Sequence, residues 1–135
     1  MTWTPPGPAW LFCPADRPER FGKAAATADV VILDLEDGVA LDNKDAARRA
    51  IVDTPLDPDS TVVRINPIGT ADNVRDLAAL RDTAYWRIML PKAESDDLPD
   101  RVADYSIIAL IETPMGAMNV WPILGHPAVV GAMWG

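Results

Sequence analysis

An unbroken apolar run, followed at once by acidic residues, is the feature that most restricts how this chain can fold. The residues from Val30 to Leu33 are all aliphatic. Such a run is typical of a strand that is buried on both faces, as in a covered parallel sheet. Asp34, Glu36 and Asp37 follow where this strand should end. The run therefore predicts an α/β protein with carboxylates at the carboxyl end of a parallel strand.

These carboxylates can be interpreted in two ways. They could cap the next helix or form structural ion pairs, but Asp42 directly precedes the helical pattern of residues 43–52 and is better placed to cap it. Asp34 and Glu36 lie two residues apart and would point to the same side of the strand, and Asp37 opens a loop. We therefore interpret the acids as site residues, because clustered carboxylates at strand ends often belong to functional sites.

Short apolar runs alternate with helical patterns along most of the chain. We place strands at residues 10–13, 29–35, 61–66, 87–91, 106–111 and 128–134, and helices from Asp16 onward and at residues 43–52, 71–83, 94–103 and 115–124. With right-handed crossovers, these βα units can form an open doubly wound sheet or a (β/α)8 barrel. No G-x-G-x-x-G motif or P-loop supports a nucleotide-binding open sheet.

Composition restricts the partners of the protein. The net charge is −8, with only 12 lysines and arginines, which argues against a general nucleic-acid binder. We expect no membrane partner, because no segment approaches the roughly 20 apolar residues of a membrane span. The proline-rich start does not resemble a signal peptide, and the single Cys13 agrees with a reducing compartment, so a cytoplasmic location is expected.

Charged and polar residues also end the later strands. Arg64 and Asn66 lie at the end of the third predicted strand. Lys92 follows the fourth strand, and Glu112 and Thr113 follow the fifth strand. In a parallel sheet they would meet the acids at one rim. Arg64 could pair with an acid or hold a substrate oxyanion, and we expect Lys92 to be solvated. Glu112 needs a cation, which Mg²⁺ could supply.

Other candidates are weaker. The helix that begins at Thr113 could hold a substrate carboxylate with its free amides, although a proline-initiated helix without a ligand fits equally well. His126 has no partner for a catalytic triad or a zinc site. Cys13 has no histidine placed to activate it, so it is interpreted as a core residue.

Five blocks in order resemble a known family. They are residues 11–20 (LFCPADRPER), 33–39 (LDLEDGV) with Lys44, Ala47 and Arg48, 63–67 (VRINP) with Gly69 and Thr70, 90–95 (LPKAES), and 111–113 (IET) with Gly116. The chain is thus similar to the citrate lyase β-subunit-like (CitE-like) branch of the HpcH/HpaI aldolase superfamily. The resemblance implies a TIM (β/α)8 barrel, of which this chain carries about the first six strands and five helices. Residues 1–9 would be an irregular arm and residues 10–135 the N-terminal part of the catalytic domain.

The resemblance also implies roles for the rim residues. Arg64 would bind the keto acid and stabilise enolate charge, while Glu36 and Asp37 would line the same catalytic site. Glu112 would be one of two carboxylates on Mg²⁺. The second lies, in the family, just after the Trp-Gly at the end of the sixth strand, which here closes the chain at Gly135. We expect Gly135 to contact substrate, together with Arg64, Glu112 and Thr113.

The implied activity is a Mg²⁺-dependent carbon–carbon lyase that cleaves a 3-hydroxyacyl-CoA of the citryl-, citramalyl- or malyl-CoA type. Its products would be an acyl-CoA and a keto acid such as oxaloacetate, pyruvate or glyoxylate. The family is usually homotrimeric and about twice as long as this chain, so we expect the sequence to be the N-terminal half of a longer protein. The alternatives are a malyl-CoA thioesterase or malate synthase-like activity, or a truncated, non-catalytic protein that binds CoA or pairs with other subunits.

Overall fold

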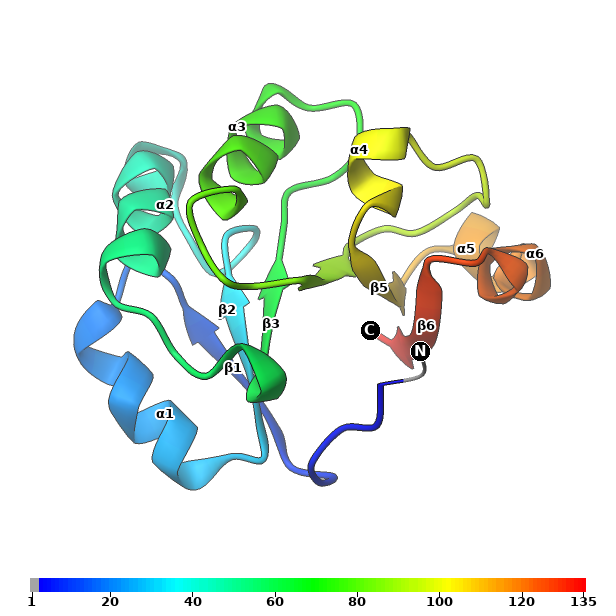
Figure 1. The fold of residues 1–135 in the computed structure, drawn as a ribbon. Helices are drawn as coiled ribbons and strands as arrows, with labels where there is room; N and C mark the ends of the chain where they lie inside the picture. Colours follow the sequence, from blue (N-terminus) through cyan, green and yellow to red (C-terminus); the bar gives the residue numbers. More distant parts are fainter. Residues whose placement is uncertain (1–2) are drawn as a thin grey trace.

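Six parallel strands form one curved sheet in which every strand lies beside its neighbours in sequence. The computed structural model describes residues 3–135. The strands are β1 (Trp10–Pro14), β2 (Val30–Asp34), β3 (Thr61–Arg64), β4 (Arg87–Leu90), β5 (Ser106–Ile111) and β6 (Val129–Trp134). A doubly wound sheet reverses its strand order at a switch point, whereas this order never reverses. The fold is therefore part of a (β/α) barrel (Figure 1).

The helices connect successive strands and lie around the outside of the curved sheet (Figure 1). They are α1 (Phe21–Thr27), α2 (Lys44–Asp53), α3 (Ala71–Leu80), α4 (Asp100–Ala103), α5 (Pro114–Met118) and α6 (Val120–Gly125), with short 3-10 helices at Pro18–Arg20, Leu41–Asn43 and Pro58–Ser60. They share one side because each right-handed crossover returns to the next strand in the same direction. In the described part of the chain, none has the length and apolarity needed to cross a bilayer.

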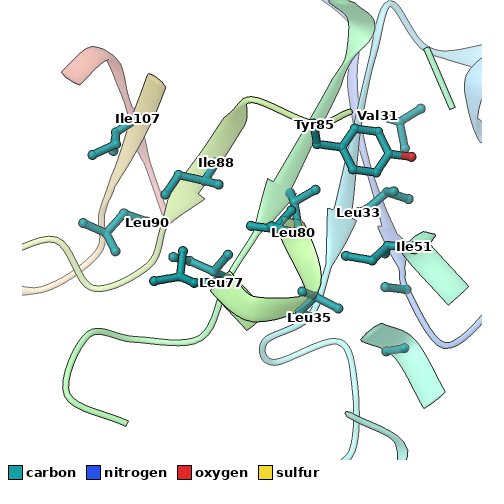
Figure 2. Packing of buried hydrophobic residues seen from close by; sticks show 14 of the residues in the cluster. Val31, Leu33, Leu35, Ile51, Leu77, Leu80, Tyr85, Ile88, Leu90 and Ile107 are labelled. Carbon is teal, nitrogen blue, oxygen red and sulfur yellow. The ribbon is translucent and has the colours of Figure 1, made fainter. Parts of the chain in front are cut away.

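The sheet separates two hydrophobic clusters. Val31 and Leu33 point outward and pack beneath the helices with Leu35, Ile51, Leu77, Leu80 and Ile88 (Figure 2). Val30 and Ile32 point inward, where they join Val62, Met89, Ile108 and Leu110. This alternation confirms the prediction that the apolar run forms a strand buried on both faces.

The residues before β1 contact the amino-terminal ends of the strands. Residues 3–9 contain no helix or strand. The guanidinium of Arg87, the fully buried first residue of β4, lies 3.7 Å from the Trp3 ring centre and 3.8 Å from that of Trp86. Burial lowers the pKa of Arg87 to about 10. Because Trp3 also packs edge-on against Trp10, this segment is held against the sheet.

The predicted bounds were most in error for two helices, while the helix expected at residues 71–83 ends three residues earlier, at Leu80. The helix expected at residues 94–103 is only Asp100–Ala103, because Pro99 disfavours helix at the residue before it and the Asp97 N–H donates to Ser95 Oγ instead. The helix expected at 115–124 is two helices that meet at Asn119. Pro122 has no N–H to donate to the preceding turn, so it is tolerated only in the first turn of a new helix, α6. The described chain therefore has six α-helices, not five.

Two acids predicted to begin helices have other positions. Asp42 lies inside the short helix Leu41–Asn43, and no side chain caps α2. Asp16 precedes the 3-10 helix Pro18–Arg20, and its Oδ2 accepts a hydrogen bond from Asn43 Nδ2 at 3.1 Å. The prediction that Asp42 caps α2 was therefore wrong, and Asp16 instead connects the loop after β1 to the loop after β2.

Candidate active site at the carboxyl ends of the strands

Asp34, the last residue of β2, is the anchor of the candidate site. Its Oδ1 accepts hydrogen bonds from Glu36 N at 2.9 Å and Arg64 Nε at 2.8 Å, and its Oδ2 accepts from Gly38 N at 2.8 Å and Arg64 Nη2 at 2.6 Å. These four donors saturate a carboxylate that is almost fully buried. Asp34 therefore forms a structural ion pair, which was the alternative interpretation of these acids, and has no oxygen left for a ligand.

Arg64 ends β3 and is held rigidly. Two of its three nitrogens bind Asp34, and its Cζ lies 4.7 Å from the ring centre of Phe12. Burial opposes the charged form, but the hydrogen bond and charge of Asp34 outweigh it and raise the pKa of Arg64. The third nitrogen, Nη1, has only a longer contact of 3.4 Å to Glu36 Oε1. Two nitrogens of Arg64 thus bind the carboxylate of Asp34, and the third faces the carboxylate of Glu36.

Glu36 lies in the loop after β2 with its carboxylate buried. Its Oε2 accepts a hydrogen bond from Lys92 Nζ at 2.6 Å. Its Oε1 has no hydrogen-bond partner among the described residues and lies nearest the cation of Arg64. The carboxylate therefore has one committed oxygen and one free acceptor.

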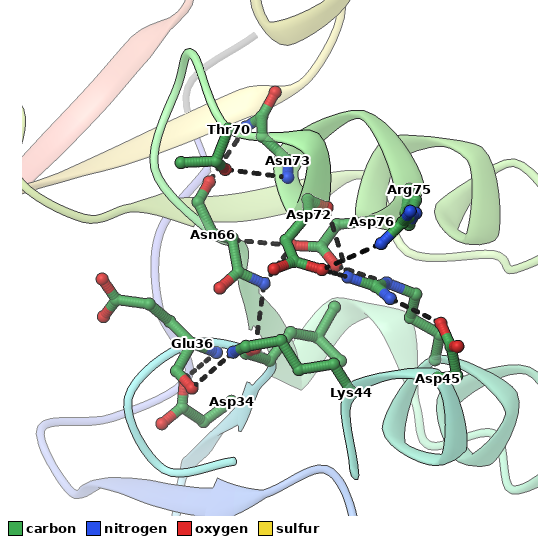
Figure 3. Close-up of polar contacts among 12 residues, drawn as sticks. Asp34, Glu36, Lys44, Asp45, Asn66, Thr70, Asp72, Asn73, Arg75 and Asp76 are labelled. Atoms are coloured by element: carbon green, nitrogen blue, oxygen red, sulfur yellow. Dashed lines mark hydrogen bonds and ion pairs between the residues drawn. The ribbon is translucent and has the colours of Figure 1, made fainter. Parts of the chain in front are cut away.

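A polar network beneath the rim fixes the main chain next to Glu36 (Figure 3). The Leu35 carbonyl accepts from Lys44 Nζ at 2.8 Å and from Asn66 Nδ2 at 2.9 Å. Asn66 is held by the fully buried Asp76, whose Oδ2 accepts from its N and Nδ2, both at 2.7 Å. Asp76 Oδ1 in turn accepts from Arg48 Nε at 2.8 Å. Helices α2 and α3 thereby support the loops after β2 and β3.

Lys92, two residues beyond β4, is not simply solvated as predicted. Its side chain is 44% exposed, yet its Nζ pairs with Glu36 and lies 3.9 Å from Asp37 Oδ2. The Glu36 hydrogen bond raises the pKa of Lys92, so the pair is complete at neutral pH and is lost only as pH rises through this raised value. Lys92 has a φ of 50°, a left-handed conformation that is uncommon for residues other than glycine.

Glu112 follows β5 and lies next to Lys92. Its Oε1 accepts a hydrogen bond from Lys92 N at 2.8 Å. Its Oε2 faces Gly135, where an added Cβ would lie 3.2 Å from that oxygen. Thr113 Oγ1 accepts from Gly116 N at 3.0 Å, so this hydroxyl caps α5. The structure thus brings Gly135 beside Glu112, while the Thr113 side chain is occupied by the helix.

Together these residues form a row across the ends of neighbouring strands. From Arg64 the contacts pass through Glu36 and Lys92 to Glu112, and Asp37 lies at the exposed margin with its side chain 75% exposed. A cavity of about 380 Å³ adjoins the row and is lined by Glu36, Asp37, Lys44, Asn66, Thr70 and Lys92. Positive and negative groups therefore alternate along one rim, beside a space for a ligand.

The oxygen atoms of this rim suit part of a hard-cation site. Within residues 3–135 no three His, Cys, Asp or Glu side chains gather closely enough to hold a metal ion by themselves. Mg²⁺ usually takes only one or two protein carboxylates and completes its shell with water and substrate oxygens. Glu112 Oε2 accepts no protein hydrogen bond in the described structure and is available as one such ligand.

Gly116 is required by close packing at the start of α5. A Cβ built on it would overlap the Ala93 carbonyl, which belongs to the loop after β4. We expect Gly116→Ala to lower the free energy of unfolding by about 1–3 kcal/mol, because either the helix or the loop must shift. Gly22→Ala is the control, since its Cβ would meet nothing within 4 Å. Urea denaturation of both variants measures the difference, and equal stability would contradict this account.

Fold and site together define a class: an α/β-barrel protein with its charged groups gathered at the carboxyl ends of the strands, where barrel enzymes carry their active sites. The model of the HpcH/HpaI aldolase/citrate lyase family matches residues 9–135. The chain belongs to this family.

Three relatives indicate the range of activities near this sequence. A citrate lyase subunit beta-like protein of Mycobacterium tuberculosis is 63% identical over 129 residues, which cover 96% of this chain and 47% of that protein. A (3S)-malyl-CoA thioesterase of Cereibacter sphaeroides is 32% identical, covering 93% and 47%. An L-malyl-CoA/beta-methylmalyl-CoA lyase of Rhodobacter capsulatus is 42% identical over 101 residues, covering 65% and 32%. The chain spans about half the length, or less, of these curated relatives.

Solved structures from Mycobacterium tuberculosis agree with the fold. The citrate lyase beta subunit complexed with oxaloacetate and magnesium superposes with a TM-score of 0.93 at 63% identity, covering 96% of this chain and 58% of that one. CitE in complex with magnesium, acetoacetate and coenzyme A gives the same TM-score and identity, covering 96% and 48%. These relatives bind magnesium together with small keto acids, and one also binds coenzyme A.

Proposed function

We propose that the native protein is a magnesium-dependent carbon–carbon lyase acting on a 3-hydroxyacyl-CoA of the citryl-, citramalyl- or malyl-CoA type. The products would be an acyl-CoA and a keto acid such as oxaloacetate, pyruvate or glyoxylate. The observation that carries the proposal is the row at the rim, in which the fixed Arg64 and the available oxygen of Glu112 lie on either side of the Glu36–Lys92 pair. The ligands of the Mycobacterium tuberculosis structures support it.

Each residue of the row has a different role in the proposed reaction. Glu112 would hold Mg²⁺, which when bound supplies a Lewis acid for the oxygens of the keto-acid portion. Arg64 Nη1 would hold the oxygen on which enolate charge develops, and needs no reorientation because Asp34 already fixes the guanidinium. Glu36 Oε1, a buried acceptor without a hydrogen-bond partner in the described structure, would take the hydroxyl proton. Asp37 would line the exposed margin, and Gly135 would leave space for substrate beside Glu112.

The proposed reaction conserves atoms and electrons. The hydroxyl proton passes to the base while the carbon–oxygen bond of that hydroxyl becomes the keto carbonyl. The adjacent carbon–carbon bond breaks, and its electron pair passes to the acyl-CoA portion as an enolate. Protonation of the enolate carbon then gives the acyl-CoA. The positive charge of Arg64 stabilises the intermediate charge without taking part in a bond.

Glu112→Ala tests the metal role. In the native protein we expect the substitution to lower kcat/KM for magnesium-dependent cleavage by at least about 10²-fold, because a carboxylate ligand is lost. Isothermal titration should show a parallel loss of Mg²⁺ affinity. Asp53→Ala removes an exposed carboxylate at the end of α2, on the side that leads to the amino end of β3 and away from the row, and is the matched control. Full turnover and unchanged Mg²⁺ affinity in Glu112→Ala would contradict the assignment.

Thioester hydrolysis is the second candidate, favoured by the similarity to a (3S)-malyl-CoA thioesterase. Malyl-CoA separates the two reactions. Cleavage of the carbon–carbon bond yields acetyl-CoA and glyoxylate without a free thiol, whereas hydrolysis yields malate and the free thiol of CoA. Following both glyoxylate and thiol in one assay therefore decides between them, and binding of malyl-CoA without either product would support a non-catalytic CoA-binding protein.

We infer further that residues 10–135 form the N-terminal part of the barrel's catalytic domain, in a cytoplasmic homo-oligomer, with a trimer favoured by the family resemblance. Sedimentation equilibrium of the native protein measures the assembly. A monomer at micromolar concentration would contradict it.

A further inference from the structure

We propose that Lys92 is a positioning residue that keeps Arg64 available for substrate, because its pairing with Glu36 keeps that carboxylate, already 3.4 Å from Arg64 Nη1, from closing into a hydrogen bond with it. This inference rests on the proposed function and deepens it. Lys92 makes two contacts at once, through its ammonium to Glu36 Oε2 at 2.6 Å and through its main-chain N–H to Glu112 Oε1 at 2.8 Å. It is the residue through which the two carboxylates of the row are connected.

The backbone conformation of Lys92 is the first part of the argument. Its φ of 50° is disfavoured for a residue with a Cβ, whereas a glycine would adopt it without strain. A glycine would also keep the N–H that binds Glu112. The contact that lysine makes here and glycine could not make is therefore the one from its ammonium to Glu36. Strain of this kind at a site indicates a functional constraint.

Competition for Glu36 is the second part. The buried Glu36 has two cations within reach, Lys92 at 2.6 Å and Arg64 Nη1 at 3.4 Å. A buried carboxylate that loses a partner must find another, because leaving it unpaired is costly. Without the ammonium, Glu36 would close on Arg64 Nη1. That nitrogen is the one Asp34 leaves free, so the closed pair would occupy the group assigned to the substrate.

Three variants separate the two contacts. Lys92→Met removes the ammonium and keeps an unbranched apolar side chain that is one atom shorter, Lys92→Gly removes the ammonium and the strain but keeps the N–H, and Lys92→Arg restores a cation. Lys23→Met, on the exposed face of α1, is the matched control. The measurements, in the native protein, are the dissociation constant of Mg²⁺ alone and that of pyruvate in saturating Mg²⁺, both by isothermal titration.

We expect Lys92→Met and Lys92→Gly to weaken pyruvate binding by at least about tenfold, since Glu36 then competes for Arg64. Mg²⁺ affinity should stay within about twofold of wild type in Lys92→Gly, because the N–H to Glu112 is retained. Lys92→Arg should recover most of the pyruvate affinity, and Lys23→Met should match wild type in both measurements.

The outcomes that overturn the inference are distinct from those that overturn the proposed function. Unchanged pyruvate affinity in Lys92→Gly, no recovery in Lys92→Arg, or loss of Mg²⁺ binding in Lys92→Gly would each overturn the role given to Lys92. If Lys92→Met fails to fold, Lys92→Gly still decides the question because it relieves strain. A wild-type protein that binds neither Mg²⁺ nor pyruvate would instead overturn the proposed function, and this inference with it.

Discussion

Arg64→Lys is expected to lower kcat/KM for cleavage by about 10²–10³-fold although it preserves the charge. A lysine has one nitrogen, so it cannot bind both oxygens of Asp34 and also present a third donor to substrate. Steady-state kinetics of the native protein, with thermal unfolding as a check on folding, measure the effect. Arg101→Lys changes an exposed arginine of α4 and is the control. Near wild-type turnover in a folded Arg64→Lys variant would mean that the third nitrogen has no catalytic use.

Arg48→Ala should lower the free energy of unfolding by about 3–5 kcal/mol. Arg48 is buried and pairs with Asp76, which is fully buried, and with Asp72 at 2.6 Å. Although burial opposes its charge, hydrogen bonds to Asp72 and Asp76 raise the pKa of Arg48. Removing it leaves the Asp76 carboxylate without a counter-ion in the interior.

Arg49→Ala is a closely matched control for this variant, because Arg49 is the next residue of α2 and is exposed. Its loss should change stability by less than about 0.5 kcal/mol. Urea denaturation of both variants compares the two positions. If Arg48→Ala costs no more than Arg49→Ala, the network does not support the loops as described.

Much of the fold could be predicted from sequence because the strands are apolar runs with clear limits. Both ends of the strand Ser106–Ile111 were predicted correctly. The apolar run from Val30 to Leu33 correctly predicted a strand buried on both faces. Helix bounds were less accurate, because they depend on local hydrogen bonds. Asp42 had the right residue type and position for a cap, but the chain forms a 3-10 turn there first.

The position of the site followed from topology, whereas its pairings did not. Strand ends in a parallel sheet meet at one rim, so Glu36, Arg64 and Glu112 could be placed together from the sequence alone. The partner of Arg64 depends on strand register, which sets Asp34 of β2 opposite Arg64 of β3. Lys92 was wrongly expected to be solvated because its partner, Glu36, lies 56 residues away in the sequence. The left-handed backbone conformation of Lys92 also cannot be predicted from composition or residue spacing.

The saturation of Asp34 also bears on substrate choice. Since its four hydrogen bonds lock the ends of β2 and β3 into one rigid unit, Arg64 cannot swing to follow ligands of different length. Under the proposed function, Arg64 therefore holds one end of a bound keto acid at a fixed position. If Arg64 binds the keto acid as proposed, discrimination between short and long keto acids comes from the opposite end of the row, around the exposed Glu112.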